Sequence, residues 1–95
     1  EIEEQVLKNQ EISEAAVVGV PNEDGLIRLA LFIVAPELTG SRKKFETQLI
    51  LSLKANLSIY KCPRRVYFLE EMPLTATGKL QRFVLRNIAE RRQMD

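Results

Sequence analysis

The sequence predicts an α+β fold in which a small three-stranded sheet packs against helices. Two short apolar runs, residues 15–20 and 26–35, are bounded by proline or by a turn and indicate strands. Apolar residues that recur every four positions over residues 43–58 indicate an amphipathic helix. The predicted order is helix, strand, strand, helix, strand, helix, which suits one small domain over all 95 residues.

The first half of the chain contains the first helix and two strands. Residues 1–9 place apolar side chains at helical spacing among charged ones, which predicts an amphipathic helix. The valine-rich strand 15–20 ends at a proline, and residues 22–25 have the composition of a turn. The next run, 26–35, is apolar except for Arg28, which predicts a strand buried on both faces.

The second helix follows a loop at residues 36–42. Ser41 at the end of this loop is a suitable N-terminal cap, because its hydroxyl can accept a bond from a free amide of the first turn. The helix predicted over residues 43–58 offers one apolar stripe to the core: Phe45, Leu49, Ile50, Leu53 and Leu57.

A third strand and a third helix complete the predicted fold. Pro63 precedes a strand at residues 64–69 whose side chains alternate between two faces, with Val66 and Phe68 opposite Tyr67 and Leu69. The helix predicted over residues 81–92 turns apolar side chains to the core and charged ones largely outward. The inward set is Val84, Leu85 and Ile88, and the outward set is Arg82, Arg86, Glu90 and Arg91.

Composition limits the chemistry that this chain can perform. An apolar content of 45% with 28% charged residues is ordinary for a soluble globular protein. With no histidine and one cysteine, the chain can build neither a Cys–His dyad nor a structural zinc site, and Cys62 is predicted to be a small packed residue. No apolar run is long enough to span a membrane, and the single cysteine suits a reducing compartment, so we expect a cytoplasmic protein. Lysine and arginine must therefore carry any catalysis.

Charge is distributed unevenly along the sequence. Residues 1–53 hold 5 basic and 9 acidic side chains, a net charge of −4, and residues 54–95 hold 9 basic and 4 acidic ones, a net charge of +5. This asymmetry favours an anionic partner for the second half, although a merely solvated surface would have the same pattern.

The stretch 73–82 lies between the last strand and the last helix and concentrates polar chemistry. Thr75, Thr77 and Gly78 lead into Lys79, so the backbone can approach a ligand closely and a cation stands on a flexible stem. The stretch is not a P-loop, because that motif needs a glycine where Pro73 stands and a serine or threonine directly after the lysine. Taken alone, it also fits a simple turn that ends in a solvated lysine.

Several linked motifs resemble the C-terminal domain of the acyl-adenylate-forming superfamily, which includes acyl- and aryl-CoA ligases. They are the Tyr-Lys-Cys-Pro-Arg block at 60–64, the Pro-Leu-Thr-Ala-Thr-Gly-Lys loop at 73–79 and the Arg-Phe-Val-Leu-Arg segment at 82–86. The run 14–21 looks like the first strand of that domain, so the resemblance covers essentially the whole chain. Residues 81–86 and 25–28 look most like benzoate- and hydroxybenzoate-CoA ligases, with medium-chain fatty acyl-CoA synthetases as the nearest alternative.

The resemblance implies roles for individual residues. It makes Lys79 the catalytic lysine of adenylation, with Thr75, Thr77 and Gly78 supporting its loop. The candidates for contact with the nucleotide part of CoA are Lys61, Arg64 and Arg82, each of which would also serve as a solubilising surface residue. The substrates implied are ATP, CoA and a carboxylic acid, and Mg²⁺ is implied only by the ATP, because nothing in this chain would ligate it.

The chain also departs from the family pattern. Leu74 stands where relatives often have a basic residue, which weakens any contact between the loop entrance and a CoA phosphate. The hinge and the large N-terminal domain with the ATP and acid sites would precede Glu1, so we expect an excised C-terminal domain that is inactive alone and whose partner is that N-terminal domain. Two other classes stay open. One is a basic nucleic-acid-binding module, against which the mild pI of 8.2 argues, and the other is a structural or dimerising domain.

Overall fold

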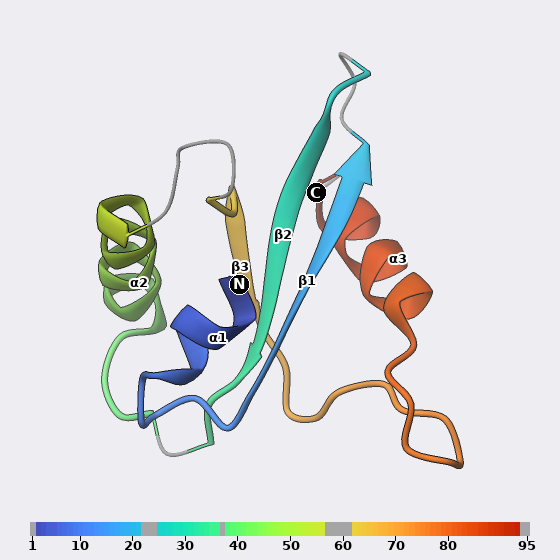
Figure 1. Ribbon diagram of the computed structural model, residues 1–95, viewed down its shortest axis with the longest axis horizontal. Coiled ribbons are helices and arrows are strands. Elements are labelled where there is room, and N and C mark those ends of the chain that lie inside the picture. Colours follow the sequence, from blue (N-terminus) through green and yellow to red (C-terminus); the bar gives the residue numbers. More distant parts are fainter. Residues whose placement is uncertain (1, 22–24, 37, 57–61, 94–95) are drawn as a thin grey trace.

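In the part of the chain that the structure describes, three helices and three strands form a three-layer arrangement with the sheet in the middle (Figure 1). The structure is a computed structural model, and it describes residues 2–21, 25–36, 38–56 and 62–93. The elements in chain order are α1 (Ile2–Leu7), β1 (Glu14–Pro21), β2 (Ile27–Val34), α2 (Arg42–Asn56), β3 (Arg65–Phe68) and α3 (Arg82–Gln93). This order and the α+β class confirm the prediction.

The strands lie in the order β1-β2-β3. β1 pairs with β2 antiparallel over their whole length, and β3 pairs with β2 in parallel from Ala30 to Ile33. A parallel pair needs a long crossover connection, and here α2 lies within that crossover. The two edges of the sheet are therefore β1 and β3.

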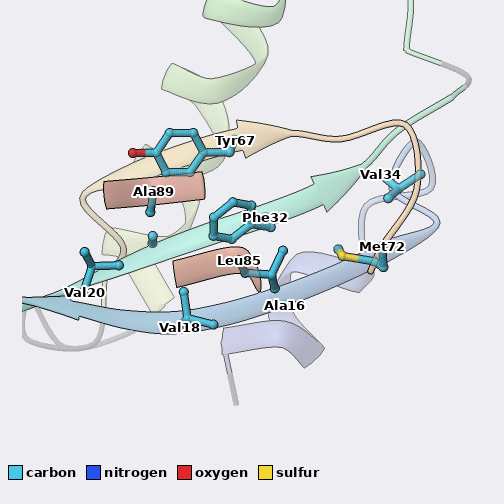
Figure 2. Packing of buried hydrophobic residues seen from close by; sticks show 10 residues of the cluster. Ala16, Val18, Val20, Phe32, Val34, Tyr67, Met72, Leu85 and Ala89 are labelled. Carbon is cyan, nitrogen blue, oxygen red and sulfur yellow. The ribbon is translucent and has the colours of Figure 1, made fainter. Parts of the chain in front are cut away.

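Each face of the sheet carries its own apolar cluster. Successive strand residues point to opposite faces, so Phe32 lies in one cluster and its neighbours Leu31 and Ile33 lie in the other. The cluster under α3, here called the α3-side cluster, is drawn in Figure 2 and consists of Ala16, Val18, Val20, Ala30, Phe32, Val34, Tyr67, Met72, Leu85 and Ala89. The cluster under α1 and α2, here called the α1/α2-side cluster, consists of Val6, Ile12, Leu31, Ile33, Leu49, Leu53 and Val66.

The predicted core positions of the helices and of the third strand are largely confirmed. Leu49 and Leu53 of α2 are buried, with Phe45 and Ile50 packed beside them, whereas Leu57 lies outside the described residues. In β3, Val66 and Tyr67 point to opposite clusters, and the Tyr67 ring stacks on Phe32 with centroids 4.9 Å apart. The Ser41 cap is present, with the Lys44 amide 3.3 Å from the serine hydroxyl.

One prediction about β2 is wrong in part. The run 26–35 is buried on both faces only from Ala30 to Val34, whereas the side chain of Ile27 is 69% exposed. The reason is the length of β3, which begins opposite Ala30 and leaves the first residues of β2 paired with β1 alone. The turn predicted at 22–25 falls largely outside the described residues; Gly25 at its end has a φ of 81°.

On each edge of the sheet, a glutamate side chain accepts a hydrogen bond from one backbone amide. Glu3 of α1 accepts a hydrogen bond from the Val17 amide of β1 at 3.0 Å, and Glu46 of α2 accepts one from the Val66 amide of β3 at 3.4 Å. Free backbone groups at a sheet edge invite pairing with another chain, and these carboxylates occupy one such amide on each edge. None of the helices within the described ranges has the length and apolar character that crossing a membrane requires.

Candidate functional site

The stretch between β3 and α3 folds into a small hairpin that projects away from the layered core (Figure 1). Leu74 and Leu80 form an isolated antiparallel bridge, and the five residues between them make the tip. Residues 74–80 are called the lysine hairpin below. Lys79 is the last residue of the tip and its side chain is exposed.

The backbone of the lysine hairpin closes on itself. The Thr75 amide donates to the Lys79 carbonyl at 2.8 Å, and the Gly78 amide donates to the Thr75 carbonyl at 2.9 Å. At the base, the Gln81 amide donates to the Pro73 carbonyl at 2.9 Å. The chain reverses at Gly78, where φ is 86°, in the left-handed region that side chains other than glycine rarely adopt.

The two threonine hydroxyls complete this network. The Thr75 hydroxyl accepts a hydrogen bond from the Lys79 amide at 3.0 Å, and it also lies 3.1 Å from the Thr77 hydroxyl. Thr75 thus binds the backbone, whereas Thr77 acts on the backbone only through Thr75. The Thr75 hydroxyl therefore holds the main chain of Lys79, and the Thr77 hydroxyl contacts that hydroxyl.

The Lys79 ammonium makes no hydrogen bond or ion pair with the residues that the structure describes. The hairpin therefore fixes where the lysine stem starts and leaves its charged end available. Such an arrangement can bring one positive charge to an anion supplied from outside this domain.

The three residues named as CoA contacts are not brought into one cluster. Arg64 precedes β3, at one edge of the sheet, and its amide donates to the Leu29 carbonyl at 2.9 Å. Arg82 begins α3 and binds β1, at the other edge. Lys61 lies outside the described residues.

Arg64 lines a surface cavity of about 720 Å³ next to the end of α2. Arg28 and Lys54 line the same cavity, so three cationic side chains border it, together with the Cys62 thiol. Sequence inspection did not single out Arg28 or Lys54 for this role. Their positions depend on the packing of α2 beside β2, which no local pattern reveals.

Arg82 was predicted to point largely outward, and the structure gives it specific partners. Its Nη1 donates to the Val17 carbonyl at 2.7 Å, and Nη2 lies 3.3 Å from Oε1 of Glu3. Both charged side chains stay partly accessible, at 44% for Arg82 and 36% for Glu3. No local pattern indicates that Glu3 is a partner of Arg82, because 79 positions separate the two residues.

The described residues hold no group of three or more His, Cys, Asp or Glu side chains that could bind a metal ion. The candidate groups are a lysine at the tip of a hairpin and a separate cavity that is lined by Arg28, Lys54 and Arg64.

Comparison with known proteins gives a consistent result. Residues 1–79 match the family described as the AMP-binding enzyme C-terminal domain. The chain is 56% identical over 77 residues to a 3-hydroxybenzoate–CoA ligase of Aromatoleum sp. (strain CIB), and 52% identical over 79 residues to a 3-hydroxybenzoate–CoA/4-hydroxybenzoate–CoA ligase of Thauera aromatica. The matched segments cover 81% and 83% of this chain respectively, but only 15% of each relative.

Solved structures support the same relationship. The fold is similar to part of an anthranilate CoA ligase solved in complex with anthranoyl-AMP, with a TM-score of 0.79 and 36% sequence identity. That match covers 93% of this chain and 17% of the other. The chain thus corresponds in extent to one small part of these larger proteins.

Proposed function

The chain belongs to the AMP-binding enzyme C-terminal domain family, and from this premise we propose that it serves as the C-terminal domain of an ATP-dependent aryl acid–CoA ligase. In this role Lys79 supplies the positive charge of the adenylation step. The observation that carries the proposal is the lysine hairpin, which holds the Lys79 backbone by two hydrogen bonds to Thr75 and leaves the Lys79 side chain exposed.

Adenylation needs such a charge. A carboxylate oxygen attacks the α-phosphorus of ATP, the new acyl–phosphate bond forms, and the bond to pyrophosphate breaks. Three anionic groups must come together, and a cation between them offsets their repulsion and the charge that develops in the transition state. A lysine about 4 Å from a phosphate oxygen contributes roughly 4 kcal/mol at an effective dielectric constant of about 20.

The position of the hairpin suits delivery of the lysine from outside the substrate pocket. The hairpin projects from the layered core, so its tip can enter a cleft of a neighbouring domain while the core stays outside (Figure 1). We propose that the domain moves as a rigid body between the two half-reactions and withdraws Lys79 before the CoA thiol attacks. Domain and lid movements of this kind are a common way to assemble and dismantle an active site.

The cavity lined by Arg28, Lys54 and Arg64 is our candidate for the phosphate groups of CoA. Three cations at one cavity suit a ligand with several phosphate charges better than the single Arg82 does. The aryl class of the acid is proposed from the relatives, since the acid itself would bind in another domain.

The test uses the complete ligase that carries this domain and compares wild type with Lys79→Ala in separate half-reactions. Adenylation is followed by benzoate-dependent ATP–pyrophosphate exchange, and thioester formation by supplying premade benzoyl-adenylate with CoA. Losing one preorganised charge contact should lower the exchange rate about 10²–10³-fold and leave thioester formation near the wild-type rate.

Lys44→Ala is the matched control, because Lys44 is also an exposed lysine but lies on α2. It should retain both half-reactions. Wild-type exchange in Lys79→Ala would refute the catalytic assignment. If the wild-type ligase activated hexanoate but not benzoate, the ligase proposal would stand and the aryl class would be wrong.

A further inference from the structure

We propose that Arg82 is a positioning residue for Lys79, acting through a closed set of bonds with Glu3 and the backbone of Val17. This inference rests on the proposed function of Lys79. Arg82 is the first residue of α3 and follows Lys79 by three positions. Its side chain binds the edge strand β1 of the sheet.

The hairpin acts as one unit because its own hydrogen bonds join both of its legs. Thr75 and Lys79 are bonded twice, through the Thr75 amide and through the Thr75 hydroxyl, and Pro73 and Gln81 close the base. The direction in which Lys79 points is therefore decided where the two legs meet the rest of the domain.

The two segments that join the hairpin to the domain are the leading leg, residues 72–74, and the trailing leg, residues 80–82. These legs make both apolar contacts and directional hydrogen bonds. On the leading leg, Met72 is buried in the α3-side cluster, and on the trailing leg, Leu80 packs against the same cluster. Apolar contacts hold the legs against the core but impose little direction, because hydrophobic attraction is non-directional. Directional bonds on the trailing leg come from Arg82.

The Arg82 guanidinium is held at several points. Nη1 donates to the Val17 carbonyl at 2.7 Å and to Oε1 of Glu3 at 3.4 Å, while Nη2 donates to the same oxygen at 3.3 Å. Oε1 of Glu3 also accepts the Val17 amide at 3.0 Å, so the three residues form a closed cycle. A planar, multi-donor guanidinium suits such a cycle, whereas a lysine at this position would provide only a point charge.

Exposure argues that this cycle determines geometry more than overall stability. Both charged side chains are more than a third exposed, and ion pairs at such positions contribute little to folding. Losing them would leave the core intact and free the start of α3, and with it the hairpin, to shift. A displacement of about 1 Å at a catalytic group can lower a rate about 10²-fold.

The experiment compares Arg82→Ala and Glu3→Ala in the complete ligase with two matched controls, Arg91→Ala and Glu4→Ala. The control residues are exposed charges on α3 and α1. At saturating ATP and benzoate we expect Arg82→Ala to lower the exchange rate by about 10- to 100-fold with unchanged KM values and unchanged thioester formation. Glu3→Ala should follow in the same direction, and both controls should match wild type.

A double variant identifies the route of the effect. If Arg82 acts only by placing Lys79, then Arg82→Ala should cause no further loss of exchange in a Lys79→Ala background. Equal loss in both backgrounds would overturn the proposal, because Arg82 would then act on the reaction independently. If thermal denaturation shows that Arg82→Ala is not folded at the assay temperature, Arg82→Lys serves as the milder variant. It should lower the exchange rate by an intermediate amount.

Failure of this inference is distinguishable from failure of the proposed function. Wild-type exchange in Arg82→Ala, with strong loss in Lys79→Ala, would overturn the positioning role alone. Wild-type exchange in Lys79→Ala would overturn both proposals.

Discussion

Gly78 shows at the residue scale how backbone geometry and proposed catalysis meet. Its φ of 86° lets the chain reverse directly before Lys79, and a Cβ built at this position would meet no atom within 4 Å. The cost of a side chain at Gly78 is therefore conformational and not steric. For an ordinary residue, the left-handed region costs about 1–2 kcal/mol.

This leads to a prediction for Gly78→Ala. The strain falls on the hairpin alone, so the conformation that presents Lys79 should become less populated and the exchange rate should fall by about 5- to 30-fold. Gly40→Ala is a close control, because Gly40 also has a positive φ, 92°, and no atom within 4 Å of a built Cβ. It should lower thermal stability similarly and leave exchange unchanged; equal exchange in the two variants would contradict the prediction.

At the residue scale, sequence reasoning named the hairpin residues but not all of their partners. Thr75, Gly78 and Lys79 lie within five positions, so turn chemistry brings them together. Arg82 was named too, but as a surface residue or a CoA contact, because its partners Glu3 and Val17 are remote in sequence. The roles of these residues in catalysis stay predictions until the half-reactions are measured.

At the scale of elements, α3 has two distinct sides. Leu85 is fully buried in the α3-side cluster, whereas Phe83, two residues earlier, is 58% exposed. The helix therefore depends on a narrow apolar strip for its attachment to the sheet (Figure 2). Its first residue also begins the bonded cycle with Glu3, so the same helix serves the core and the hairpin.

We predict that Leu85→Ala lowers the free energy of unfolding by about 2–5 kcal/mol, because it leaves a cavity between α3 and the sheet. Phe83→Ala removes a larger side chain from the same helix but should change stability by less than about 1 kcal/mol, since most of that side chain is already in water. Urea unfolding followed by circular dichroism measures both. A larger loss for Phe83→Ala would show that α3 packs in another orientation.

At the scale of the whole molecule, one sheet serves two clusters. Residues 31, 32 and 33 of β2 alternate between the two clusters, so loss of packing in either cluster removes contacts from the same strand. Small single domains with a shared core element usually unfold in one cooperative transition.

We therefore predict a single unfolding transition that responds to both clusters. In a Tyr60→Phe background, Tyr67 fluorescence reports the α3-side cluster, because Tyr67 is then the only tyrosine and stacks on Phe32. Leu53→Ala changes the opposite cluster, yet it should lower the fluorescence midpoint and the circular dichroism midpoint equally. Two separate midpoints would show that the two faces unfold independently.

The element order, the alternation of side chains in β3 and the cap of α2 could be predicted from local sequence patterns. Each of these features depends on residues that lie close together in the sequence. Burial of only the second half of β2, from Ala30 to Val34, could not be predicted in this way. The apolar run continues to residue 26, but β3 pairs only from Ala30 onward, and that register depends on the crossover through α2.

The sequence by itself determined the fold class, the family and the lysine loop, because periodicity, turn residues and linked motifs are properties of neighbouring positions. Only the tertiary structure decided that Arg82 faces Glu3 and that Arg64 shares a cavity with Arg28 and Lys54. These groupings arise when the sheet brings together segments far apart in the chain, and the contacts that select them are non-local. The physical reason is that local propensity depends on neighbouring residues, whereas a binding surface combines residues that are remote in sequence and meet only in the folded protein.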